Sequence, residues 1–175
     1  MNRDTARTIA DALTWSRIAS VIPITILAIY DLKWWVLGLY VAAALTDLLD
    51  GMFARRGAPP KSNFDLDGVA DRILSFATVL WLWLLLPGFL QKYWLPYVPI
   101  ILAMEVYINF VRIRYERFDV PHLPFGRIAM ALFFTLLPVV LVFGDLPWFA
   151  HAVLIIVVAS ELQLTWAFWR KSRAR

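Results

Sequence analysis

The sequence of 175 residues contains no cysteine, only two histidines and few charged residues, which make up 17% of the chain. The absence of cysteine excludes disulfides, thiolate metal sites and cysteine nucleophiles. His122 and His151 are too few and too far apart in sequence for a histidine metal site. Any metal must therefore be held by carboxylates, whose hard oxygen ligands favour a cation such as Mg²⁺ or Mn²⁺.

Hydrophobic residues, by contrast, make up 61% of the chain, whereas soluble domains contain about 45–50%. This composition excludes a disordered chain, a coiled coil and a soluble enzyme with a polar shell. We expect an all-α integral membrane protein that folds as a single domain over residues 1–175. Apolar runs of about 20 residues predict transmembrane helices, and a short interfacial helix is expected before them at residues 4–13. Six spans are predicted, at residues 13–30, 34–50, 68–86, 94–113, 126–143 and 148–168.

The net charge of +4 is explained by membrane topology rather than by nucleic-acid binding. With the N-terminus inside, every Lys and Arg except Lys33 and Lys92 falls on the cytoplasmic side of the six predicted spans. Basic residues accumulate on the cytoplasmic side of membrane proteins. We therefore expect both termini to be cytoplasmic. Because the sequence shows no eukaryotic targeting signal, we expect a prokaryotic inner membrane.

Carboxylates cluster where the second predicted span ends and the third begins. Asp47 and Asp50 are three residues apart, and Asp67 and Asp71 are four apart, so each pair shares one face of a helix. A carboxylate at membrane depth costs about 2.5–3.5 kcal/mol or more, so the cluster requires neutralising cations. Two neighbouring helices could bring the four carboxylates together around one or two hard divalent ions. Such a site would lie on the cytoplasmic side.

The residues between these carboxylates suit a diphosphate ligand. Gly51 and Ala54 are small and leave room against the helix backbone, and basic residues follow at Arg55, Arg56 and Lys61. Metals combined with basic side chains are the chemistry of a diphosphate site. The alternative is a salt-bridged helix end facing the cytoplasm. That alternative explains Asp65 well, but it explains Asp47 and Asp50 poorly because they close an apolar helix.

Residues 46–55 read TDLLDGMFAR, and residues 67–71 read DGVAD. This pattern resembles the signature of the CDP-alcohol phosphotransferases, a family also called CDP-alcohol phosphatidyltransferases. Residues 13–17, LTWSR, are similar to the opening of the first helix in many members. The sequence departs from the family at Asn63, which replaces the second signature glycine, and the preceding loop is one residue shorter.

The resemblance implies an enzyme that transfers a phosphatidyl group from a CDP-linked lipid donor, such as CDP-diacylglycerol, to a hydroxyl of a polar acceptor and releases CMP. It implies that two ions, Mg²⁺ or Mn²⁺, are bound and that Asp71 is the general base. The implied metal ligands are Asp47, Asp50, Asp67 and Asp71. The implied donor-binding residues are Thr14, Gly51, Ala54, Arg55 and Asn63. A homodimer embedded in membrane lipid is also expected.

The acceptor is less well defined by the sequence. Arg112 and Arg127 flank the loop between the fourth and fifth spans and are candidates for binding a phosphorylated acceptor, although a positive-inside loop explains them equally well. Glu105 and Arg112 resemble a pair in the phosphatidylglycerophosphate synthase branch. Glycerol phosphate, inositol phosphate and serine all remain open as acceptors. Glu105 and Glu161 could each pair with a buried base such as Arg17 or Arg112.

Two other functions remain open. A cation transporter lined by carboxylates would need acidic groups spread through the depth of the membrane, whereas the aspartates gather at one end of the helices. A noncatalytic membrane subunit that keeps the fold is also possible because Asn63 departs from the family signature.

Overall fold

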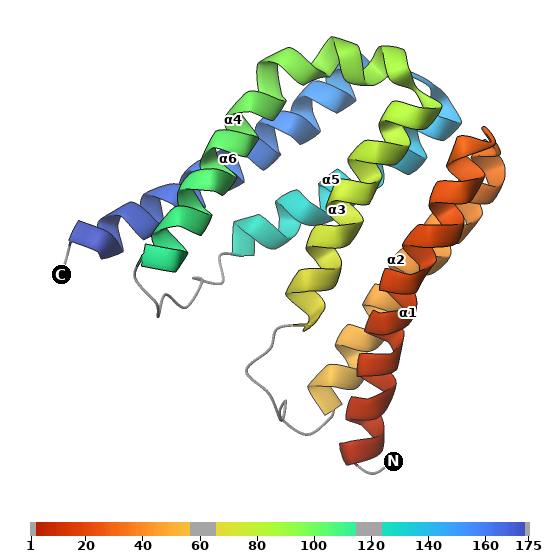
Figure 1. The fold of residues 1–175 in the computed structure, drawn as a ribbon, viewed down its shortest axis with the longest axis horizontal. Coiled ribbons are helices and arrows are strands. Elements are labelled where there is room, and N and C mark those ends of the chain that lie inside the picture. Colours follow the sequence, from red (N-terminus) through yellow and green to blue (C-terminus); the bar gives the residue numbers. More distant parts are fainter. Residues whose placement is uncertain (1–2, 57–65, 115–123, 174–175) are drawn as a thin grey trace. The chain divides into compact units, whose positions relative to one another are not determined.

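A computed structural model describes residues 3–56, 66–114 and 124–173. Within these ranges the chain is helical and contains no strand, which confirms the all-α prediction for this part (Figure 1). The helices are α1 (Arg3–Ile29), α2 (Lys33–Arg56), α3 (Leu66–Leu85), α4 (Pro87–Arg114), α5 (Pro124–Phe143) and α6 (Pro147–Arg173).

Local sequence sets several helix ends. Pro87, Pro124 and Pro147 open α4, α5 and α6, a position where proline loses no hydrogen bond and its fixed φ suits a helix. Gly144 ends α5 in a left-handed conformation, with φ +78°. Its N–H donates to the carbonyl of Val140 at 3.0 Å, which is a common way to satisfy the last carbonyls of a helix. These signals make the connections from α3 to α4 and from α5 to α6 short.

The prediction of a separate interfacial helix at residues 4–13 is wrong. α1 runs without a break from Arg3 to Ile29, and no glycine or proline interrupts the sequence before Pro23. Its buried side also continues through the predicted boundary, because Ala10 and Thr14 are both buried. At 1.5 Å per residue, the 27-residue helix is about 40 Å long, which is longer than the hydrocarbon core of a bilayer.

Four helices in the described residues are long and apolar enough to cross a membrane. They are Thr8–Ile29, Gly68–Leu85, Phe125–Phe143 and Pro147–Ala167, and each overlaps a predicted span. The apolar part of α2 is shorter, at Lys33–Thr46, because the aspartates begin at Asp47. α4 is 28 residues long but is not among these four. The count of six spans therefore remains a prediction.

Contacts divide the chain into two units, Met1–Pro87 and Gly88–Arg175, and each is described by itself. In the first unit α1 packs against both α2 and α3 (Figure 1). The buried residues follow one face of each helix. On α1 they are Ala10, Thr14, Arg17, Ile24 and Ala28; on α2, Val36, Tyr40 and Ala43; and on α3, Ala70, Leu74, Ala77, Thr78, Trp81, Leu82 and Leu85.

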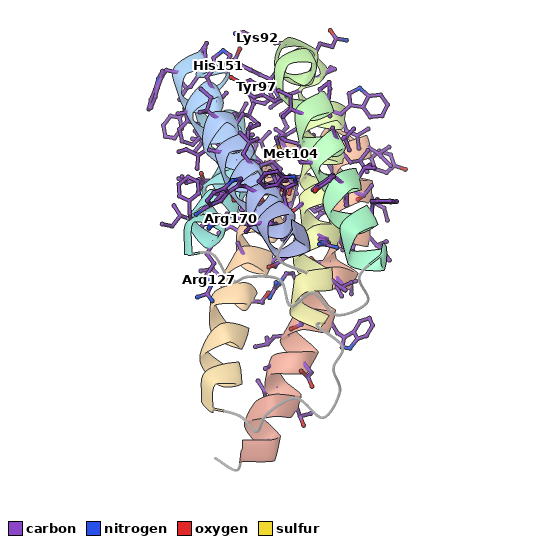
Figure 2. All side chains as sticks on the ribbon, turned by 90° about the vertical axis from the view of Figure 1, so that its left-hand side faces the viewer. Lys92, Tyr97, Met104, Arg127, His151 and Arg170 are labelled. Atoms are coloured by element: carbon purple, nitrogen blue, oxygen red, sulfur yellow. The ribbon has the colours of Figure 1, made fainter. Side chains whose placement is uncertain are left out.

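In the second unit α5 packs against α6. Polar side chains link α4 to α6 and to the short connection between α5 and α6. The Tyr97 hydroxyl and His151 Nδ1 lie 2.7 Å apart. Asp145 accepts from the Tyr93 hydroxyl and from Lys92 Nζ, both at 2.8 Å. Figure 2 shows Lys92, Tyr97 and His151 toward one end of this unit and Arg127 and Arg170 toward the other.

Candidate functional site

A charged pair lies between α1 and α3 in the first unit. Arg17 Nη1 donates to Asp71 Oδ1 at 2.9 Å. The Arg17 side chain is 1% exposed, whereas that of Asp71 is 34% exposed. Asp71 is therefore bonded to a fully buried arginine on one side, while part of its own side chain remains accessible. This contact brings together an arginine of residues 13–17 and the last aspartate of the 67–71 segment.

Two further polar contacts define how the three helices are aligned. Trp81 Nε1 donates to the hydroxyl of Thr25 at 2.9 Å. Because Thr25 follows Arg17 on α1 and Trp81 follows Asp71 on α3, the two contacts together show that α1 and α3 run in the same direction. The hydroxyls of Tyr40 and Thr78 lie 3.4 Å apart, and the rings of Tyr40 and Trp81 pack edge to face at 5.8 Å. α2 therefore contacts α3 at Tyr40, and Figure 1 shows these two helices running in opposite directions.

The Tyr40–Thr78 contact fixes the level of the aspartates along the two helices. Asp47 lies seven residues after Tyr40, and Asp71 lies seven residues before Thr78. Because α2 and α3 are antiparallel, both backbone positions are about 10.5 Å from the contact in the same direction. Asp50 and Asp67 follow on the next turn. The register thus places two aspartates on each helix at matching heights.

The same positions continue the packed faces of the helices. On α2 the buried series Val36, Tyr40 and Ala43 has spacings of four and three, and residue 47 is the next step. On α3 the buried series Leu74, Thr78 and Trp81 extends backward to Asp71 and residue 67. Side chains that repeat at three and four residues share one side of a helix. The backbone register is therefore compatible with the predicted site, which itself remains a prediction.

The structure describes some of the predicted site side chains and not others. The side chains of Asp47, Asp50, Ala54, Arg55, Asp67 and Arg112 lie outside the described part, as does the whole of residue 63, whereas the backbone of residue 51 lies within α2. Among the side chains that it does describe, no three His, Asp or Glu gather as a metal site. Because three of the four predicted ligands are outside this set, the metal site remains a prediction.

Thr14 and Arg127 are both described, and they lie in different settings. Thr14 is buried and its hydroxyl donates to the carbonyl of Ala10 at 3.1 Å. Its place on α1 is one turn before Arg17, on the same face. Arg127 is exposed in the first turn of α5, where it is accessible to a ligand. The two residues belong to different units, so each is considered separately.

The comparison with protein families adds to this geometry. The sequence matches the CDP-alcohol phosphatidyltransferase family over residues 7–167. The chain belongs to this family. The match includes all four motif aspartates and the Arg17–Asp71 pair. No curated protein and no solved structure matches the chain.

Membership in the CDP-alcohol phosphatidyltransferases identifies the protein as a transferase of substituted phosphate groups. The family transfers a phosphatidyl group from a CDP-alcohol to an acceptor alcohol, a role in phospholipid biosynthesis. The apolar helices of the chain and its membership in this family together indicate an integral membrane protein. The match does not distinguish the phosphatidylglycerophosphate synthase branch, which remains a prediction.

Arg17 is the residue that the sequence alone did not assign to the site. The sequence left Arg17 open, with Arg112, as a base that could pair with Glu105 or Glu161, and the structure shows that Arg17 pairs with Asp71. One signal was present, because Arg17 interrupts the apolar stretch Thr8–Ile29 and ionisable residues inside such helices usually mark function. Its partner lies 54 residues away, and that pairing required the packing of α1 on α3.

Proposed function

We propose that this CDP-alcohol phosphatidyltransferase uses a CDP-linked lipid such as CDP-diacylglycerol as donor and a polar alcohol, with or without a phosphate group, as acceptor, and releases CMP. We further propose that it requires two divalent ions, Mg²⁺ or Mn²⁺, bound by Asp47, Asp50, Asp67 and Asp71. The observation that carries the proposal is the register of α2 and α3, because the Tyr40–Thr78 contact aligns the two aspartate pairs at one level.

The chemistry of the proposed ligands fits the ions. Mg²⁺ and Mn²⁺ prefer oxygen ligands, and the four residues supply only carboxylates. Four carboxylates on adjoining helix faces would repel one another without cations. When bound, the ions would neutralise the donor diphosphate and the charge that develops on the departing CMP. The two aspartate pairs are the source of specificity for hard cations.

The residues of the chain itself bind and orient the substrates. Asp71, with its side chain partly exposed, takes the proton of the acceptor hydroxyl as general base. Gly51 and Ala54 let the cytidine and ribose approach the α2 backbone, and Arg55 binds the donor phosphates. Thr14 and Asn63 complete the donor pocket. The acceptor phosphate is bound by Arg112 and by Arg127, whose side chain is exposed.

The membrane setting supports a site at the boundary between lipid and water. Trp148 and Trp166 are exposed on α6 and are 18 residues apart in sequence, which corresponds to about 27 Å along the helix. This spacing is close to the thickness of the hydrocarbon core, and tryptophans favour both of its borders. On α1 the exposed Trp15 lies two residues from Arg17. This supports a proposed position of the Arg17–Asp71 pair near one border, where a lipid head group would be.

We also propose six spans with both termini and the active site cytoplasmic, in a prokaryotic inner membrane. The positive-inside distribution of Lys and Arg supports this orientation. Lys92 lies toward the opposite end of the second unit from Arg127 and Arg170 (Figure 2), as this topology requires. A homodimer is proposed as well.

The experiment is a CMP-release assay with purified protein in detergent, CDP-diacylglycerol and a panel of acceptors. We expect CMP release that depends on Mg²⁺ or Mn²⁺, stops with EDTA and is supported by one acceptor among glycerol 3-phosphate, inositol phosphate and serine. Asp71→Asn should abolish release while the protein keeps its thermal unfolding transition. Full activity of Asp71→Asn would refute the base assignment, and full activity in EDTA would refute the metal requirement. Ion flux without CMP release would favour the transporter alternative.

A further inference from the structure

We propose that Arg17 is a positioning residue for the transfer reaction. Its guanidinium holds the Asp71 carboxylate in the orientation in which the carboxylate accepts the proton of the acceptor hydroxyl. This inference rests on the proposed function, in which Asp71 is the base. The structure contributes the contact itself, in which Arg17 Nη1 donates to Asp71 Oδ1 at 2.9 Å. Arg17 acts through Asp71, since its own side chain is 1% exposed.

The burial of Arg17 argues against a role in stability alone. An arginine stays charged in proteins, and removing that charge from water is unfavourable, so a buried ion pair adds little or nothing to stability compared with apolar residues. The buried face of α1 on either side is otherwise apolar or neutral, with Thr14 before Arg17 and Ile24 after it. α1 and α3 are joined independently by the Trp81–Thr25 hydrogen bond. Helix packing therefore does not require a charge at position 17.

The asymmetry of the pair indicates what the charge does. The buried guanidinium approaches Oδ1, while 34% of the Asp71 side chain is exposed. A carboxylate has two oxygens and about four lone-pair sites, so a bond to Arg17 still leaves it able to accept a proton. The planar guanidinium fixes direction better than a lysine ammonium does. Arg17 thus limits the rotation of the carboxylate from the α1 side.

The α1–α3 interface offers a matched control. Thr25→Val removes the hydroxyl that accepts from Trp81 Nε1, which is another polar link between the same two helices. If Arg17 only joins α1 to α3, Arg17→Gln and Thr25→Val should both lower the unfolding temperature and leave the kcat of the folded protein unchanged. If Arg17 positions Asp71, only Arg17→Gln should lower kcat.

The test measures kcat, the donor KM and the unfolding temperature for wild type, Arg17→Gln, Arg17→Lys and Thr25→Val. Loss of a residue that orients an active-site ligand typically costs about 10–100-fold in activity or metal affinity. We expect Arg17→Gln to lose kcat by that factor with the donor KM within about twofold of wild type. Arg17→Lys should recover part of the loss because it restores the charge without the planar geometry.

A second readout does not depend on activity. In wild type, Mg²⁺ with CMP should raise the unfolding temperature, and Arg17→Gln should reduce that increase. In an Asp71→Asn background, adding Arg17→Gln should cause no further reduction, because a residue that acts through Asp71 has nothing left to orient. A further reduction in the double variant would show that Arg17 acts elsewhere, and it would overturn the inference.

The outcomes separate this inference from the proposed function. A wild-type protein that releases no CMP from CDP-diacylglycerol would refute the proposed function. A wild type that releases CMP, with Arg17→Gln matching Thr25→Val in kcat, would refute the role of Arg17 and leave the proposed function in place. If Arg17→Gln does not fold, the comparison of Arg17→Lys with Thr25→Val decides the question in the same way.

Discussion

A bulky residue at position 43 should separate the two pairs of aspartates. Ala43 is 5% exposed and lies on the packed face of α2, one turn before Asp47. Ala43→Leu adds three carbon atoms to that face, and overpacking of this kind typically costs about 1–3 kcal/mol because neighbouring backbone must move. Asp47 is only four residues further along, or about 6 Å on the helix axis. The displacement at Ala43 should therefore reach the aspartate.

The effect on catalysis should exceed the effect on stability. A misplacement of about 1 Å can cost about 100-fold in rate when reacting groups must be aligned. We expect Ala43→Leu to fold, to unfold at a lower temperature and to lose kcat by about 10–100-fold. Ala42→Leu is the matched control because Ala42 is exposed and immediately precedes Ala43 on the same helix. It should retain wild-type kcat.

The assay is CMP release over a range of Mg²⁺ concentrations, with unfolding followed in the same detergent. A result in which Ala43→Leu and Ala42→Leu have equal kcat would refute the reasoning, because α2 would then not carry its aspartates toward α1 and α3. A loss in Ala43→Leu that extra Mg²⁺ fully restores would still support it, since poorly placed ligands bind the ions more weakly.

Two further predictions concern other contacts. Trp81→Phe should lower the unfolding temperature by removing the bond to Thr25, worth about 0.6–1.7 kcal/mol in membrane proteins, and an unchanged transition in a thermal melt would contradict it. In the second unit the hydrogen bond from Lys92 holds the pKa of Asp145 below its usual 3.8, and the hydrogen bond to Asp145 raises the pKa of Lys92 above 10.5. A carboxyl whose pKa is lowered in the folded protein stabilises the fold at pH values above its pKa in the unfolded chain, and an amine whose pKa is raised stabilises the fold at pH values below its pKa in the unfolded chain. The stabilisation by this pair is therefore complete between pH 3.8 and pH 10.5. Lys92→Met should unfold at a lower temperature than wild type at pH 7. This difference in unfolding temperature should shrink as the pH falls below 3.8, and a difference that stays constant with pH would contradict the prediction.

The sequence was sufficient to predict the helices but not all of their ends. Hydropathy over about 20 residues locates the helices at Gly68–Leu85, Phe125–Phe143 and Pro147–Ala167, which the structure shows to be long and apolar enough to cross a membrane. It placed the start of the first span at residue 13, because Asp4, Arg7 and Asp11 lower the hydropathy of the segment before it. Charged residues do not end a helix when no glycine or proline interrupts it, so α1 begins at Arg3.

The candidate site was predictable in part for a different reason. Spacing alone places Asp47 with Asp50 and Asp67 with Asp71, because helical periodicity is local. The alignment of one pair with the other depends on tertiary contact, and it emerged only with the Tyr40–Thr78 contact. The sequence could not choose Asp71 as a partner of Arg17 for the same reason, since the choice among distant carboxylates is made by helix packing.

The central claim is that α2 and α3 together hold divalent ions through their four aspartates. Its most direct measurement is an electron paramagnetic resonance titration of Mn²⁺ into the detergent-solubilised protein in the presence of CMP. The account predicts about two bound ions per chain, with loss of at least one in Asp47→Asn and in Asp71→Asn, which lie on different helices. Wild-type protein that binds no Mn²⁺, or variants that bind as much as wild type, would contradict it.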